Sequence, residues 1–125
     1  MTTQAGSLFP SAYGTIDFST NWNNKLNCNF FTTVRLWRNQ FRVGDKWIVR
    51  LNEKEIKLVQ VLTVKPVRLH ELDSTITLLD AGLMPERFRE LMLEIYEDHV
   101  PSVDDALFVL VALSTIETYA VAPAQ

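Results

Sequence analysis

The sequence predicts an α+β fold in which a small, β-rich sheet curls around the apolar stripe of a helix. Strand-like segments with alternating or β-branched residues fill residues 29–64. After Pro66 the spacing of apolar residues changes to the three- and four-residue steps of helices. An apolar block at 106–113 predicts one more strand, so the expected order is three strands, two helices and a strand.

The length and composition favour one globular domain over residues 1–125. A chain of 125 residues, of which 47% are hydrophobic and 22% charged, can bury one core, and no repeat or linker divides it. The segment of about 1–24 is polar with scattered aromatics, and we expect irregular structure with a short helical turn there. With Cys28 as the single cysteine, no leader and no apolar run of about 20 residues, we expect a cytoplasmic protein without a disulfide or membrane contact.

Three strands are expected in the first half of the chain. The first covers 29–37, where alternation gives two faces. One of these faces carries Phe31, Thr33, Arg35 and Trp37. A turn at 42–45 precedes a strand over 47–51, and a hairpin loop at 52–55 leads to a strand over 56–64 that is apolar on both faces.

Two helices follow in the acidic second half. Ser74 is expected to cap a short helix that ends at Gly82, and Pro85 to begin a helix that ends at about Asp98. One stripe of the second helix is apolar and is expected to pack on the sheet: Met84, Phe88, Leu91, Met92 and Ile95. Residues 102–105 resemble a helix cap, but the apolar block that follows suits a buried strand, which we predict.

Charge is divided unevenly along the chain, although the net charge is only −3. Ten of the twelve basic residues lie within 25–68, and eleven of the fifteen acids lie after residue 68. Such asymmetry is compatible with a basic face that meets polyanions, and equally with attraction between the two halves of one domain. The sequence leaves both interpretations open.

Common cofactor and metal motifs are absent from the sequence. It contains no P-loop, dinucleotide fingerprint, nucleophile elbow or His-Glu-x-x-His pattern. His70 and His99 are far apart, and neither has a Cys or a second His at ligand spacing. We therefore expect no cofactor and no metal.

The first predicted strand carries the candidate ligand-binding residues. Thr33 and Arg35 can hold a phosphate or carbonyl by hydrogen bonding, beside aromatic rings that can stack on a nucleobase. The full candidate set for binding is Arg35, Phe31, Trp37, Trp22, Asn23 and Arg38. Each of these residue types also has a structural explanation. The aromatic residues can belong to the core, and Arg35 can pair with an acid. The asparagines can bond to the backbone of a turn, and the basic residues can simply be solvated.

The segment Thr-Thr-Val-Arg at 32–35, followed by Val-Gly-Asp at 43–45 and a strand, resembles the ASCH division of the PUA-like superfamily. Further similarity to uncharacterised ASCH-like proteins of phages and bacteria lies in 18–26, 31–36 and 79–96. The resemblance spans about residues 16–113. It implies a PUA-like small curled β-barrel with two to three helices, in a superfamily associated with RNA and modified nucleosides.

The resemblance also implies a possible reaction. Similar ASCH hydrolases remove the acyl group of N4-acetylcytidine with a threonine nucleophile, a lysine just upstream and a later carboxylate. The threonine matches Thr33, two residues before the arginine of the motif. The lysine position is Phe30 here, which leaves Lys25 as the nearest substitute, and the carboxylate corresponds to Asp80 after a one-residue shift.

We therefore predict that the chain binds RNA, or a modified nucleotide or nucleoside, in a cleft between the first strand and the segment near Asp80. Two alternatives stay open. The first is an amidohydrolase of an acylated nucleoside with Thr33, Lys25 and Asp80 as catalytic residues. The second is a phage-encoded interaction module that contacts a host protein through its aromatic surface and acidic half.

Overall fold

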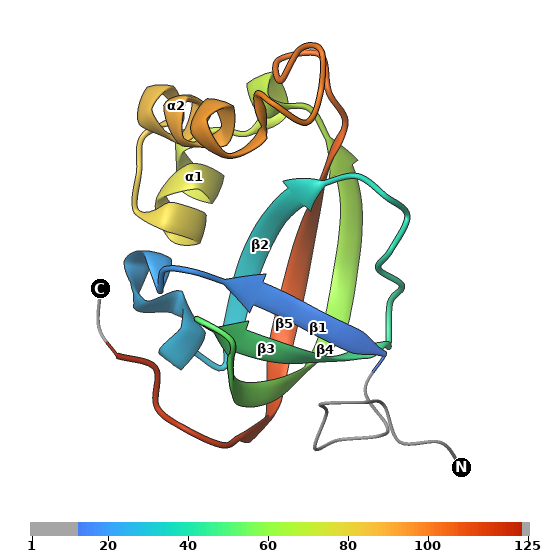
Figure 1. The fold of residues 1–125 in the computed structure, drawn as a ribbon, viewed down its shortest axis with the longest axis vertical. Coiled ribbons are helices and arrows are strands. Elements are labelled where there is room, and N and C mark those ends of the chain that lie inside the picture. The colour runs from blue at the N-terminus through green and yellow to red at the C-terminus, as the bar shows by residue number, and fades with distance from the viewer. Residues whose placement is uncertain (1–12, 124–125) are drawn as a thin grey trace.

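The computed structural model describes residues 13–123, which form one curled sheet with the two α-helices gathered at one end of it (Figure 1). The elements in chain order are β1 (Gly14–Phe18), η1 (Trp22–Asn27), β2 (Phe30–Leu36), β3 (Lys46–Leu51), β4 (Lys54–Val67), η2 (Leu69–Glu71), α1 (Ser74–Ala81), α2 (Pro85–Tyr96) and β5 (Phe108–Thr118). Here η marks a 3-10 helix. The predicted α+β class with a small curled sheet is confirmed.

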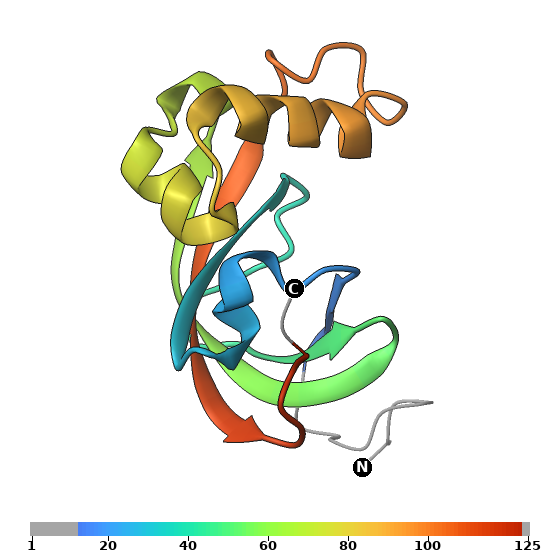
Figure 2. The ribbon, with the colours of Figure 1, turned by 90° about the vertical axis from the view of Figure 1, so that its left-hand side faces the viewer.

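The sheet has five strands in the order β1-β3-β4-β5-β2, so β1 and β2 form its two edges. The β1–β3 pair is parallel and the other pairs are antiparallel. The pairing of β4 with β5 shifts register between Leu58 and Val59 and again between Val61 and Thr63. Such irregularities bend a strand and increase its twist, and β4 curves strongly in the rotated view (Figure 2). The bending brings the two edges toward one another.

The strand β1 corrects the sequence analysis, which expected irregular structure up to about residue 24. The segment is short, and only Ile16 of its five residues is buried. Pairing with the backbone of β3 therefore forms this strand, and a single sequence does not reveal that partner. The expected helical turn is confirmed as η1. The part of the expected irregular segment before Tyr13 lies outside the described residues.

The two helices have nearly the predicted bounds, with one corrected cap. Asp73, not Ser74, caps α1, because its carboxylate accepts a hydrogen bond from the backbone N–H of Ile76 at 3.1 Å. Gly82 ends α1 in the left-handed conformation with φ of 71°, as predicted. Pro85 begins α2, which ends at Tyr96.

Only part of the apolar stripe of α2 packs on the sheet, which corrects the second expectation. Phe88 and Met92 are buried in a core with Phe108 of β5. Met84 and Ile95 are 51% and 44% exposed. The helix lies across the end of the curled sheet, so only part of its length faces a strand (Figure 2).

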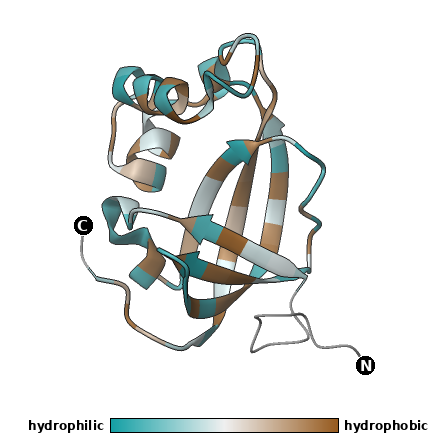
Figure 3. Cartoon of the chain, viewed as in Figure 1, coloured by the Kyte–Doolittle hydropathy of each residue, from teal (hydrophilic) through white to brown (hydrophobic). Residues whose placement is uncertain are grey.

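The last segment forms the strand β5, as predicted. The hydroxyl of Ser102 accepts a hydrogen bond from the backbone N–H of Asp105 at 3.3 Å, which closes a turn instead of capping a helix. The third predicted strand, now β4, is buried at four successive residues, 56–59, although Leu62 is 40% exposed. Apolar and polar bands alternate along the strands in Figure 3. Within residues 13–123, no helix is long and apolar enough to span a membrane.

Candidate ligand-binding site

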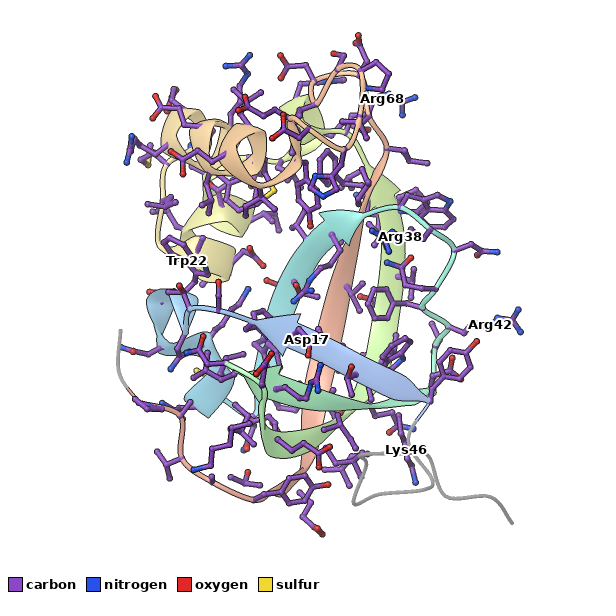
Figure 4. The ribbon with its side chains drawn as sticks, in the orientation of Figure 1. Asp17, Trp22, Arg38, Arg42, Lys46 and Arg68 are labelled. Atoms are coloured by element: carbon purple, nitrogen blue, oxygen red, sulfur yellow. The ribbon has the colours of Figure 1, made fainter. Side chains whose placement is uncertain are left out.

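A cavity of about 210 Å³ lies where the two edge strands meet the helices. The ends of β1 and β2, the start of η1, and the facing sides of α1 and α2 form its walls. Trp22 and Asp17, labelled in Figure 4, come from two of these walls. The lining residues are Asp17, Phe18, Ser19, Thr20, Trp22, Lys25, Thr33, Val34, Arg35, Asp80, Ala81, Leu91, Met92, Ile95 and Tyr96.

Arg35 links the two edges of the sheet at this cavity. Its Nε donates to the hydroxyl of Thr33 at 3.0 Å, and its Nη2 donates to the backbone oxygen of Asp17 on β1 at 2.7 Å. The guanidinium also lies over the ring of Phe18, 4.6 Å from the ring centroid. These contacts from both strands fix the orientation of the charged group.

The charge of Arg35 has no direct carboxylate partner among residues 13–123. The carboxylate of Asp17 instead accepts from Arg50, with distances of 2.6 Å and 3.0 Å. Burial lowers the pKa of the Arg35 guanidinium from its ordinary value, but an arginine stays protonated at any working pH. A partly buried positive charge thus lines the cavity without a neutralising group in hydrogen-bond contact.

Lys25 and Asp80 form a buried ion pair in the same cavity. Lys25 Nζ lies 3.1 Å from Asp80 Oδ1, and each residue is 5% exposed. The hydroxyl of Thr32 donates to the same carboxylate oxygen at 2.8 Å. Burial lowers the pKa of Lys25, although the neighbouring carboxylate acts in the opposite direction. Both charged groups are therefore largely removed from solvent although they line the cavity.

The asparagines before β2 position this ion pair. Asn21 Oδ1 accepts from the backbone N–H of Leu26 at 2.9 Å, which closes the turn of η1. Asn23 adopts a left-handed conformation, and its amide donates to the backbone oxygens of Leu78 and Leu79 in α1 at 3.1 Å and 3.3 Å. These bonds tie η1 to α1, so Lys25 and Asp80 face one another across 55 residues of sequence.

The structure brings five of the predicted site residues into one cavity: Thr33, Lys25, Asp80, Arg35 and Trp22. The other four predicted residues lie elsewhere. Phe31 is buried in the core of the sheet, Trp37 lines a separate pocket with Pro101, and Asn23 lines an apolar pocket with Phe30. Arg38 lines a neighbouring cavity.

Alternation correctly placed Phe31 on the same side of β2 as Thr33 and Arg35. The cavity reaches only Thr33, Val34 and Arg35 of β2, so Phe31 does not line it. The roles of these nine residues in binding or catalysis stay predictions.

The sequence analysis missed the walls that β1 and α2 contribute. Asp17 lies in β1, a strand that was not expected, and Ser19 and Thr20 follow that strand directly. Leu91, Ile95 and Tyr96 belong to the stripe of α2 or lie next to it, and they line the cavity, while Tyr96 also packs edge-on against Phe108 of β5. The sequence did contain one signal for this wall. The apolar stripe of α2 has more residues than a short helix needs for packing on a sheet. Within the described part of the chain, no three His, Cys, Asp or Glu side chains are grouped so that they could hold a metal ion.

Comparison with known proteins identifies the fold. No family model matches the chain, and no curated protein matches it. A solved structure from Enterococcus faecalis, described by the family model DUF984, aligns with a TM-score of 0.66 and 10% identity over 90% of this chain and 80% of that one. An ASCH domain from Lactobacillus crispatus aligns with a TM-score of 0.60 and 15% identity over 86% of this chain and 81% of that one.

The fold is ASCH-like. This confirms the resemblance at the level of architecture, because identities of 10% and 15% carry the fold alone. The curled sheet with its helices agrees with a PUA-like small barrel. In this ASCH-like fold the cavity occupies the opening between the two edge strands.

Proposed function

We propose that this ASCH-like chain binds a nucleoside or nucleotide, free or within RNA, in the cavity between β2 and α2. The observation that carries the proposal is the position of the Arg35 guanidinium. Two strands hold it against the cavity, and no carboxylate of the described residues forms a hydrogen bond with it. Such a group favours a ligand with a phosphate or an electron-rich carbonyl. The resemblance to a superfamily associated with RNA and modified nucleosides supports the same ligand class.

The remaining walls fit the other parts of a nucleoside. Trp22 and Tyr96 offer aromatic surfaces for a base, and Ser19 and Thr20 offer hydroxyls for a sugar or a base edge. The cavity is smaller than the roughly 300–1,000 Å³ clefts that hold drug-sized ligands. It therefore suits one nucleoside, or one base extruded from a strand, rather than a folded oligomer.

Calorimetric titration tests this proposal. The ligands are the four ribonucleosides, their monophosphates and a short single-stranded RNA, added to the wild type, Arg35→Ala and Arg87→Ala. Arg87 is an exposed arginine of α2 outside the cavity and serves as the control. We expect at least one ligand to bind the wild type and Arg87→Ala alike, and Arg35→Ala to bind it about tenfold to a hundredfold more weakly.

Two results would contradict the proposal. One is the absence of binding by the wild type across the panel. The other is an unchanged affinity in a folded Arg35→Ala protein, with folding checked by circular dichroism.

A second candidate is hydrolysis of an acylated nucleoside, and the arrangement of Lys25, Asp80 and Thr33 around one cavity favours it. The lowered pKa of Lys25 increases the fraction of neutral amine that can act as a base. The bond from Arg35 to Thr33 would stabilise the alkoxide that forms when the hydroxyl loses its proton. In this reaction Thr33 Oγ1 attacks the acyl carbon, the amine of the nucleoside leaves with a proton, and water then releases the acid from Thr33.

Product release from a panel of N4-acylated cytidines tests the second candidate. Thr33→Val keeps the branched shape and removes the hydroxyl, so it should abolish turnover and retain substrate binding. Thr63→Val, on an exposed part of β4 outside the cavity, is the matched control and should keep full activity. If the wild type releases no cytidine from any member of the panel, this candidate is wrong. That result would not contradict the first proposal, which concerns binding alone.

A further inference from the structure

A second cavity of about 310 Å³ adjoins the first. Arg35 and Tyr96 line both cavities and therefore form the wall between them. Beyond this wall the second cavity is bounded by the end of β2, the loop after it, and the starts of β1 and β3. The residues used below are Arg38, Gln40, Phe41 and Trp47.

The two cavities differ in charge. The first has two bases, Lys25 and Arg35, and two acids, Asp17 and Asp80. The second has two bases and no acid among its lining residues. Arg38 is exposed and forms no ion pair with any residue in the range 13–123, so its charge is available to a ligand. Two guanidiniums without an acid favour an anion.

The loop that carries Arg38 is held in place. Gln40 Oε1 accepts from the backbone N–H of Arg38 at 2.9 Å, and Gln40 Nε2 donates to the backbone oxygen of Leu36 at 3.3 Å. Asn39 between them has a positive φ of 57°, a conformation that asparagine tolerates well. The turn thus presents the Arg38 side chain at the cavity with little freedom in its backbone.

A buried donor in the wall provides an independent observation. Trp47 is 8% exposed, and its indole N–H has no hydrogen-bond partner within the described structure. Buried donors of this kind are uncommon in folded proteins and call for an explanation. Trp47 lines the second cavity, but its indole nitrogen has almost no accessible surface, so a ligand reaches this N–H only if the side chain shifts.

We propose that the second cavity is a phosphate subsite, so that the ligand is a nucleotide whose phosphate lies between Arg35 and Arg38. This rests on the proposed function, in which the first cavity holds the nucleoside. A phosphate is much smaller than 310 Å³, so the subsite also has room for a group esterified to it. The proposal requires the ligand to pass beside the shared side chains Arg35 and Tyr96, with the nucleoside on one side of them and its phosphate on the other.

The test measures how much a phosphate improves binding. Calorimetric dissociation constants are determined for a nucleoside, its 5′- and 3′-monophosphates, a dinucleotide and inorganic phosphate. The proteins are the wild type, Arg38→Ala and the exposed control Arg87→Ala. We expect the wild type and Arg87→Ala to bind one monophosphate or the dinucleotide about tenfold or more tightly than the nucleoside. Arg38→Ala should lose this gain and keep the affinity for the nucleoside.

The ligands also separate the two sources of a phosphate. Equal affinities for monophosphate and dinucleotide support a terminal phosphate, and tighter binding of the dinucleotide supports a phosphodiester within a strand. Trp47→Phe keeps a smaller aromatic ring and removes the indole N–H, so in a protein that stays folded it should weaken phosphate-containing ligands alone.

Each contrary result has its own meaning. If the nucleoside binds and the phosphate improves affinity less than twofold, the subsite is wrong and the proposed function stands. The same holds if Arg38→Ala retains the full gain. If no nucleoside or nucleotide binds the wild type, the proposed function fails as well.

Discussion

The two adjoining cavities carry positive charge in different ways at their far ends. At the η1 end, Lys25 is buried and paired with Asp80, which also accepts from Thr32. At the loop end, neither Arg35 nor Arg38 forms an ion pair with a carboxylate in the described part of the chain. A buried pair is part of the fold, because each charge satisfies the other. Charges without a partner at a cavity are instead available to a ligand.

The same comparison bears on the uneven charge of the sequence. Of the four ion pairs found within residues 13–123, only Lys25–Asp80 joins the basic segment to the acidic one. Attraction between the basic and the acidic segment therefore accounts for one ion pair. Most of the basic residues in the basic segment lie at the surface, outside these four ion pairs. In Figure 4 Arg68, Arg38, Arg42 and Lys46 follow the right-hand edge of the molecule. This arrangement favours the interpretation that a basic edge faces a polyanion.

Removing the carboxylate of the paired end should have the largest effect on stability. Asp80→Ala leaves the Lys25 ammonium buried without its partner, which costs about 3–5 kcal/mol of unfolding free energy. Urea unfolding measures the loss. Asp104→Ala, which breaks the exposed pair with Arg89, is the control and should change stability little. Equal effects of the two variants would mean that burial of the Lys25 pair has no energetic importance.

Removing a charge from the unpaired end should act on binding instead. Arg35→Lys keeps the positive charge but cannot reproduce the fork that contacts both Thr33 and the backbone of Asp17. We expect it to weaken nucleotide binding by about tenfold, less than Arg35→Ala, and to stay folded. Calorimetry and a thermal melt of the same samples measure both quantities. If the melting temperature of Arg35→Lys falls as far as that of Asp80→Ala, then Arg35 mainly stabilises the fold, as the Lys25–Asp80 pair does.

The pH dependence of stability separates the two kinds of charge further. Burial lowers the pKa of Lys25, so the unfolded chain binds more protons than the folded one between that lowered pKa and 10.5. The contribution of Lys25 to stability therefore rises with pH through this window. Unfolding of the wild type and Lys25→Met from about pH 7 upward measures it. The wild type should gain relative to the variant as the pH rises, and a relative loss would show that the charged pair is the more stable form.

The smallest effect is expected from the basic edge outside the cavities. Arg42→Ala removes one exposed charge from the loop between β2 and β3. If a strand of RNA continues along this edge, the variant should make the negative slope of log affinity against log salt shallower by about 0.7. The binding of mononucleotides should stay unchanged. Titrations with an RNA oligomer at several salt concentrations measure the slope. The same slope for the variant and the wild type would confine the ligand to the two cavities.

The elements with strong local patterns were predictable from the sequence. The alternation around Thr33 predicted β2, and the spacing around Phe88 predicted α2. Gly82 and Pro85 fixed one boundary each, because their backbone preferences act without a tertiary partner. The strand β1 was missed because its formation depends on β3, 33 residues further along the chain at the Asp17–Arg50 pair.

The amino-acid sequence by itself determined which side chains β2 presents on one face and which chemistry they can perform, since a two-residue period is a property of the local backbone. It also named Lys25 and Asp80 as candidates, through the ASCH resemblance. Only the tertiary structure decided that these two groups neutralise one another and that Arg35 does not share their carboxylate. Charge pairing depends on distances across the fold, and here the curvature of β4 and the packing of η1 on α1 set those distances.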